Sequence, residues 1–139
     1  MLRLIALQTQ HGSLHGRLGL PEHPRGLILI VRTHRLDEDE QTAAEFEARG
    51  YATLLIDLLT TQELQFVDAT QNVPRLAQRL LDMLDLIRND GDMQVLPLGL
   101  YANGDTAPAA IRCAAQRDIQ VKALACHGGL IDRAGVQSL

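Results

Sequence analysis

Four polar residues in this sequence, His34, Asn103, Asp105 and His127, could be brought together by a parallel β-sheet. Each lies at the end of, or shortly after, an apolar segment that is typical of a buried strand. The carboxyl ends of parallel strands lie at one edge of an open sheet, where such sheets bind ligands. We therefore expect any small-molecule ligand to contact these four residues. Solvated loop side chains are the alternative, and we predict no metal ion and no cofactor.

Asp105 is also the weak candidate for a catalytic nucleophile. It follows Asn103-Gly104 at the end of an apolar segment, and a carboxylate attacks the substrate directly in some hydrolytic enzymes. The alternative is that Asp105 caps a helix beginning at Thr106, because Asp is among the residues preferred at helix N-caps. We favour the cap, so the sequence predicts no catalytic residue beyond this candidate.

Two other polar groups have structural explanations. His11 and His15 are four residues apart, but on a strand this spacing separates them by roughly 13 Å, so one ion cannot bind both. We expect both side chains to face solvent. The acidic run from Asp37 to Glu40 lacks the alternating ligands and the turn glycine of a calcium loop. Its charge suits the first turn of a helix, where it complements the helix dipole.

Composition narrows the class of protein. The chain has 139 residues, which suggests one domain over 1–139, and 46% are hydrophobic, which favours an ordered globule. The net charge is −4, Lys122 is the only lysine and aromatic residues make up 3%, which argues against binding to nucleic acid or anionic membranes. The longest apolar stretch, 26–31, is too short to span a bilayer. Two cysteines, Cys113 and Cys126, suggest no disulfide framework, and we expect a cytoplasmic protein.

The elements that would position these residues alternate along the chain. Two N-terminal strands joined near His11-Gly12 predict a β-hairpin. Continuous apolar runs then predict strands buried on both faces, separated by helical segments. A β-hairpin followed by β-α-β-α-β-α-β predicts an α/β fold, a three-layer sandwich with a mostly parallel sheet. We expect strands at 2–7, 13–20, 26–31, 51–56, 95–101 and 119–126, and helices at 40–49, 74–89 and 106–117.

Several segments, taken in order, resemble the dienelactone hydrolase branch of the α/β-hydrolase superfamily. The hairpin ending in Leu18-Gly19-Leu20-Pro21 is similar to that family's entry strands, and 26–31 is similar to the strand before its oxyanion loop. The segment 50–60 is the closest match. The segment 97–101 resembles the strand that enters the nucleophile elbow, and 121–129 resembles the strand after it. The resemblance covers nearly the whole chain and implies a truncated α/β-hydrolase fold.

The residues that would carry hydrolysis depart from that family's pattern. A nucleophile elbow has the form G-x-S-x-G, because small flanking residues permit a sharp turn that exposes the nucleophile. In the register set by 97–101, the nucleophile position falls on Gly104, which has no side chain. Arg32-Thr33 stands where the family often carries His-Gly. The family's last two strands, which supply the acid and the base, have no counterpart before Leu139, so we expect no complete triad within this sequence.

These departures predict a catalytically degenerate relative of the dienelactone hydrolases that acts through binding or assembly. The alternatives are a residual esterase that uses Asp105, a hydrolase completed by a second chain, and a gene remnant that still folds. We also expect a homodimer or another homo-oligomer, because the strand at 119–126 would have an open edge with only Lys122 as a blocking charge. The tail 129–139 could instead cover that edge.

Overall fold

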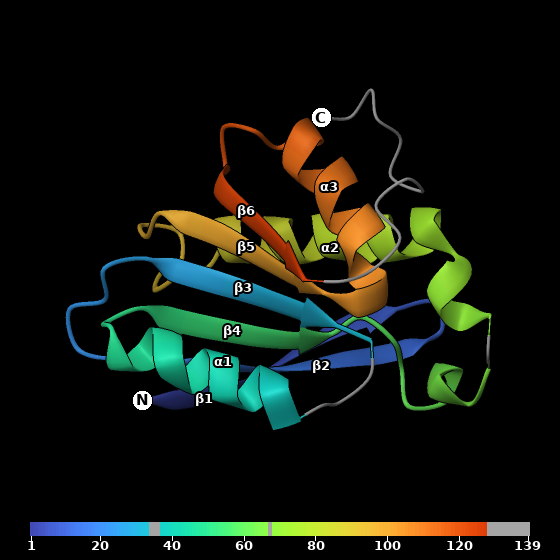
Figure 1. Cartoon of the computed structure of the whole chain (residues 1–139), viewed down its shortest axis with the longest axis horizontal. Helices are drawn as coiled ribbons and strands as arrows, with labels where there is room; N and C mark the ends of the chain where they lie inside the picture. The colour runs from blue at the N-terminus through green and yellow to red at the C-terminus, as the bar shows by residue number, and fades with distance from the viewer. Residues whose placement is uncertain (34–36, 67, 128–139) are drawn as a thin grey trace.

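Six strands form one sheet in the order β1-β2-β4-β3-β5-β6 (Figure 1). The computed structural model describes residues 1–33, 37–66 and 68–127. In this part of the chain, β1 and β2 form an antiparallel hairpin, β2 pairs antiparallel with β4, and the other neighbours are parallel. The strands are β1 (Leu2–Thr9), β2 (Gly12–Gly19), β3 (Leu27–Arg32), β4 (Ala52–Asp57), β5 (Leu98–Asn103) and β6 (Val121–His127).

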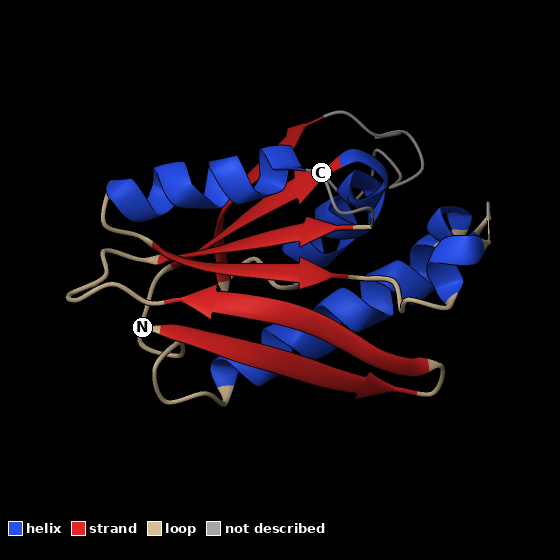
Figure 2. Ribbon diagram, turned by 90° about the horizontal axis from the view of Figure 1, so that it is seen from below, coloured by secondary structure: helices blue, strands red, loops and turns tan. Residues whose placement is uncertain are grey.

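Helices cover both faces of the sheet and give the predicted three-layer α/β sandwich (Figure 2). Helix α1 (Asp37–Ala48) packs over β3 and β4 on one face. Helices α2 (Val73–Arg88) and α3 (Ala107–Gln116) pack against each other on the opposite face. Three short 3-10 helices lie in the connections: η1 (Glu63–Gln65), η2 (Ala69–Gln71) and η3 (Gly104–Thr106). None of the helices in the described residues combines the length and hydrophobicity needed to cross a bilayer.

The hydrophobic core is unequal on the two faces. The larger cluster joins β3, β4 and β5 to α2 and α3, with Leu54, Leu80 and Leu100 among its members. The smaller cluster lies under α1 and consists of Ile30, Ala43 and Leu55, with partly buried neighbours around them. Successive residues of a strand face opposite sides of the sheet. The continuous apolar runs of β3 and β4 therefore supply both clusters.

Two strands begin later than their apolar segments predict. Val95 was expected in β5, but 91–96 forms turns in which the amides of Met93 and Gln94 donate to the Asp90 carbonyl, and Val95 stays exposed. Ile119 was expected in β6, but the turn that follows α3 leaves it exposed. These local hydrogen bonds outweigh the β-propensity of isolated Val and Ile residues, because such propensity is weak without a packed neighbour.

Candidate functional site

The turn between β5 and α3 has the sharp shape of a strand-to-helix elbow. Asn103 keeps an extended backbone, and the next residue, Gly104, has a φ of 61°. This left-handed conformation costs little for glycine and is unfavourable for other residues. A Cβ atom placed on Gly104 would meet no other atom within 4 Å. The tip of the elbow therefore has free space but bears no side chain.

Asp105 follows this tip but does not cap α3. The N-cap of α3 is Thr106, whose side chain makes no capping hydrogen bond, and Asp105 lies inside η3. The predicted cap was therefore wrong by one residue. The Thr106 hydroxyl instead donates to the carbonyls of Val31, at 3.1 Å, and Asn103, at 2.8 Å, and so ties the elbow to β3. The half-buried Asp105 side chain has no hydrogen-bond partner or ion-pair partner within the described residues.

An ion pair joins the carboxyl ends of β3 and β4. Arg32 and Asp57 are register partners on the two strands, and Arg32 Nε donates to Asp57 Oδ1 at 2.7 Å. The Arg32 guanidinium also lies 3.6 Å from the Asp39 carboxylate and 3.8 Å from the Glu40 carboxylate. Arg17 of β2 pairs with Glu40. This charged cluster therefore connects three strands to α1.

Asp39 lies in the first turn of α1, as the acidic run predicted, but it is almost fully buried, with 1% of its surface exposed. Its Oδ1 accepts a hydrogen bond of 2.6 Å from the Asn103 side-chain amide. Its Oδ2 is buried and has no hydrogen-bond partner among the described residues, although the Arg32 guanidinium is nearby. The acidic run thus does more than complement a helix dipole, because one of its carboxylates connects β3, β5 and α1.

The structure brings together part of the predicted ligand set. Asn103 and His127 are register partners at the ends of β5 and β6, and Asp105 follows two residues after Asn103. His34 lies outside the described residues. The Asn103 amide is already bonded to Asp39, and the His127 side chain is exposed. His11 and His15 are both exposed, as predicted.

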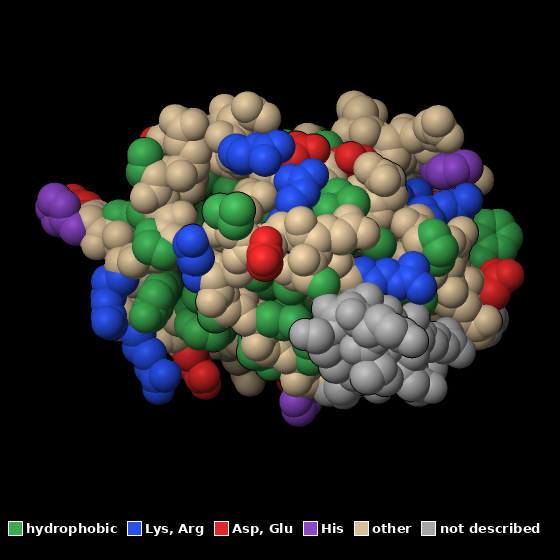
Figure 3. All heavy atoms as spheres, turned by 90° about the horizontal axis from the view of Figure 1, so that it is seen from above, with side chains coloured by type: hydrophobic (Ala, Val, Ile, Leu, Met, Phe, Trp, Pro, Cys, Tyr) green, Lys and Arg blue, Asp and Glu red, His purple; other side chains and the backbone are tan. Residues whose placement is uncertain are grey.

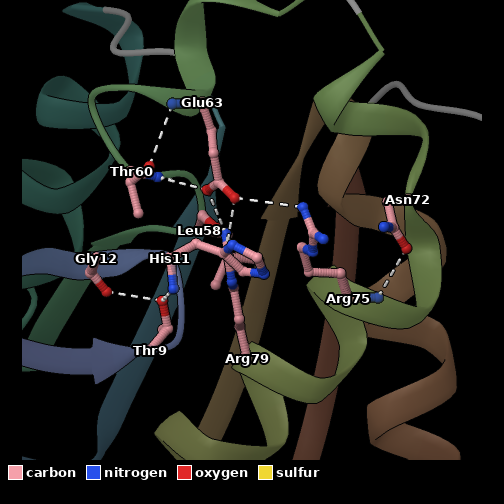
Figure 4. A network of polar contacts seen from close by, with 9 residues as sticks. All are labelled: Thr9, His11, Gly12, Leu58, Thr60, Glu63, Asn72, Arg75 and Arg79. Atoms are coloured by element: carbon pink, nitrogen blue, oxygen red, sulfur yellow. Dashed lines mark hydrogen bonds and ion pairs between the residues drawn. The ribbon is translucent and has the colours of Figure 1, made fainter.

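A second polar cluster lies beside the sheet, around Glu63 (Figure 4). Arg79 donates to both Glu63 carboxylate oxygens, at 2.6 and 2.8 Å, and to the Leu58 carbonyl at 2.8 Å. Thr60 and Glu63 form a capping box, because each backbone amide donates to the other's side chain. The hydrogen bonds from Arg79 are the largest cause that lowers the pKa of Glu63 to about 2; burial opposes this shift and the Thr60 amide reinforces it.

Two surface grooves adjoin this cluster. The first has a volume of ≈ 540 Å³ and the second ≈ 700 Å³, and both are lined by Gln10, His11 and Arg75. The hairpin tip of β1 and β2 reaches the carboxyl end of β4, since Gly12 lies close to Thr60. The grooves are therefore at the expected end of the sheet, but beside its antiparallel strands and not at β3 and β5.

The sequence contains a signal for only part of the Glu63 cluster. The spacing of Thr60 and Glu63 is that of a capping box, which such a pattern could have identified. Arg79 lies among leucines on the apolar face of α2 and is buried, with 3% of its surface exposed. The sequence pattern of α2 does not distinguish a buried arginine from one on a solvated face. The bonds from Arg79 to Glu63 can therefore be recognised only in the fold.

The remaining groups to consider are the two cysteine thiols and any cluster of metal-binding side chains. Burial raises the pKa of the Cys113 thiol to about 12 and also raises the pKa of Cys126, so neither is an activated thiolate. Both cysteines are free. The described residues contain no group of three or more histidine, cysteine and acidic side chains that could hold a metal ion.

Comparison with known sequences finds similar proteins that match this chain over only part of their own length. No protein-family model matches the chain. A protein of Mycobacterium tuberculosis named "Putative phosphoribosyl transferase" is 32% identical over 124 residues. The match covers 86% of this chain but 28% of the relative, so the chain spans little more than a quarter of the curated proteins it matches.

Solved structures define the fold. Dienelactone hydrolase from Anabaena variabilis has a TM-score of 0.86 and 27% identity, with 100% of this chain and 68% of that chain covered. Est1E from Butyrivibrio proteoclasticus has a TM-score of 0.71 and 15% identity, with coverages of 87% and 49%. A cold-adapted esterase from an Arctic intertidal metagenomic library has a TM-score of 0.68 and 17% identity, with coverages of 90% and 59%. The chain thus has the α/β-hydrolase fold, and its resemblance to dienelactone hydrolases is confirmed.

Proposed function

We propose that this chain is a catalytically inactive α/β-hydrolase-like domain that acts through binding or assembly. The observation that carries the proposal is the elbow, where Gly104 occupies the left-handed tip of the turn. Acyl transfer in this superfamily depends on a nucleophilic side chain exposed at that point. A hydrogen atom in its place cannot attack a carbonyl, and loss of the nucleophile alone removes several powers of ten in rate from a triad enzyme.

The charges around the elbow support the same proposal. In α/β-hydrolases, the oxyanion is bound by the amide of the residue after the nucleophile and by an amide from the loop after β3. Here the residue after Gly104 is Asp105, and buried Asp39 lies close to the end of β5. Arg32, at the end of β3, is already paired with Asp57. Carboxylates near the elbow would repel a negatively charged intermediate. The active enzymes instead direct free hydrogen-bond donors at that intermediate.

A residual hydrolase is the second candidate, either with Asp105 as nucleophile or with its missing groups supplied by a second chain. The observation that favours it is the Asp105 side chain, which is half-buried beside the elbow and has no partner among the described residues. A carboxylate in that state is available for attack on a substrate.

An esterase assay separates the two candidates. Wild type, Gly104→Ser and Asp105→Asn would be tested with p-nitrophenyl esters and a dienelactone, beside the exposed control Asp118→Asn. We expect all four proteins to remain near background, including Gly104→Ser, because the charges around the elbow are unchanged. Turnover by the wild type that disappears in Asp105→Asn and persists in Asp118→Asn would replace this proposal with the residual hydrolase.

The assembly part of the proposal is a homodimer formed through β6. Within the described residues this strand is the edge of the sheet next to β5, and 122–125 is exposed. Figure 3 views the molecule from this side, where hydrophobic side chains lie among scattered charged ones. Lys122 is its only charge before His127, so little prevents a second strand from pairing with it. Two copies of β6 related by a twofold axis would pair antiparallel and cover each other.

Light scattering over a range of concentrations tests the dimer. We expect the wild type to have twice the 15.3 kDa mass of a single chain at micromolar concentration. Ala123→Lys should lower the mass to that of the monomer, because a charge on an edge strand opposes pairing. The matched control is Ala6→Lys on β1, at the opposite edge, which should leave the dimer intact. A monomeric wild type, or equal dissociation of both variants, would contradict this interface.

Two further observations bear on the proposal: the name of the relatives concerns activity, and the free thiols concern cellular location. Since the chain spans 28% of the mycobacterial relatives, the transferase activity in their name is not carried over to it. Free Cys113 and Cys126 are typical of a reducing compartment, which agrees with a cytoplasmic location.

A further inference from the structure

The two grooves around Arg75 have a fixed polar framework on both rims. Figure 4 shows the hairpin tip with His11 on one side of the cluster and the start of α2 with Asn72 and Arg75 on the other. Asn72 caps α2 by accepting the Arg75 backbone amide at 3.2 Å, so the first turn is held in place. The Thr9 hydroxyl likewise bonds across the hairpin turn to the Gly12 carbonyl at 2.7 Å. Both rims are therefore preorganised by their own hydrogen bonds.

The cluster contains two arginine side chains, Arg75 and Arg79, around the single carboxylate of Glu63. The Glu63 carboxylate is bonded through both oxygens to buried Arg79 and accepts the Thr60 amide as well. Arg75 reaches the same carboxylate only through one contact of 3.4 Å, and 39% of its side chain is exposed. Its Nε and Nη2 donors make no hydrogen bond within the described part of the chain. Two guanidinium groups thus share one carboxylate, and the outer one faces both grooves.

The rest of the first groove offers a ring surface and amide groups. Phe66 is 58% exposed, which leaves its ring open to a flat partner. By contrast, Phe46 packs edge-on against Tyr51 and Tyr101. Besides Glu63, which also lines the first groove, two carboxylates reduce the positive charge: Asp68 lines the first groove, and Asp82 lines the second, where it accepts a hydrogen bond from Gln78. The side chains of Gln10, Gln62 and Asn72 add neutral donors and acceptors to the first groove.

We propose that the first groove binds a small ligand that combines a planar ring with one carboxylate or phosphate group, the anion on Arg75 and the ring on Phe66. Guanidinium groups bind both anions through paired hydrogen bonds, and an exposed aromatic ring supplies apolar contact at a low cost in entropy. Among the described residues, none that lines this groove belongs to the elbow, and the proposal does not depend on any hydrolytic activity.

Four probes test the proposal by titration calorimetry or NMR. Benzoate and phenyl phosphate carry both features, benzamide carries the ring without the charge, and inorganic phosphate carries the charge without the ring. We expect at least one of the first two to bind about tenfold or more tightly than the last two, since a charge-assisted hydrogen bond is worth this much. Whichever of the two binds better identifies the preferred anion. Equal binding of benzamide, or no binding at millimolar concentration, would overturn the proposal.

Variants locate the site. Arg75→Gln should weaken binding by about tenfold or more, and Phe66→Ala should weaken it by about threefold to tenfold. Arg88→Gln is the matched control, because Arg88 is also an exposed arginine of α2 with an acidic partner, Asp85. It should bind as the wild type does. If Arg75→Gln binds like Arg88→Gln while circular dichroism confirms that both are folded, the ligand is elsewhere and the proposal fails.

Discussion

Protonation of Glu63 should destabilise this domain in acid. The pKa of its carboxyl is lowered from 4.5 to about 2, chiefly by the hydrogen bonds from Arg79. A depressed pKa in the folded state means that the stabilisation is complete above the unfolded value and is lost as the pH falls through the folded value. At roughly 1.4 kcal/mol per pKa unit, this lowering corresponds to about 3 kcal/mol, lost between about pH 5 and pH 2.

Glu63→Gln isolates that contribution. The variant keeps the size of the side chain but leaves buried Arg79 without a counter-charge, so its free energy of unfolding at pH 7 should fall by about 3–5 kcal/mol. Near pH 2 the wild-type carboxyl is itself half protonated, so the difference between the two proteins should shrink. Urea denaturation at intervals between pH 2 and pH 7 would measure it.

The control for this experiment is Glu45→Gln, an exposed residue of α1 that should follow the wild type at every pH. Asp85 and Asp90 also have lowered pKa values, so the wild type alone would show a mixture of slopes. The difference between the wild type and Glu63→Gln removes their contributions. A difference that stays constant from pH 7 to pH 2 would refute the assignment of this acid sensitivity to the Glu63–Arg79 pair.

Three further perturbations have defined outcomes. Leu80→Ala, at a fully buried position of α2, should lower the free energy of unfolding by about 2–5 kcal/mol in chemical denaturation. Arg32→Met should lower it by about 3–5 kcal/mol because it removes the guanidinium that pairs with the buried Asp57 carboxylate, and adding Asp57→Leu should recover part of that loss. In the native protein a thiol reagent should modify Cys126 before the fully buried Cys113, whose pKa is about 12; equal rates would contradict the burial of Cys113.

Much of the fold was predictable because its strands are buried on both faces. The apolar runs that became β3 and β4 have no polar interruption, and the α2 pattern of leucines places one face against the sheet. The errors fall at the ends of elements, at Val95 and Ile119. There, hydrogen bonds between neighbouring residues decide the backbone, and hydrophobicity alone does not encode them.

The candidate site was less predictable because its chemistry is made of pairs distant in sequence. The elbow and Gly104 could be located from the order of strands, but Arg32 pairs with Asp57 across two strands and Asp39 with Asn103 across 64 positions. Each residue alone is typical of a solvated loop or a helix end. The sheet register brings Arg32 to Asp57, and the packing of α1 on the sheet brings Asp39 to Asn103. The sequence alone does not reveal either pairing until the fold is known.

The polar side chains at the strand ends are bonded to one another, whereas Arg75 at the grooves is only partly engaged. A hydrolase must leave the carboxyl ends of its central strands open for a substrate, whereas here Arg32 of β3 is tied to Asp57 of β4, and Asn103 of β5 is tied to Asp39 of α1. Such buried pairs contribute little net stability, because desolvation offsets their attraction, but breaking one of them is costly. A ligand that bound to these side chains would have to break one of these contacts. Around Arg75 a guanidinium already projects into an open groove, so a ligand there would gain hydrogen bonds without breaking a buried pair.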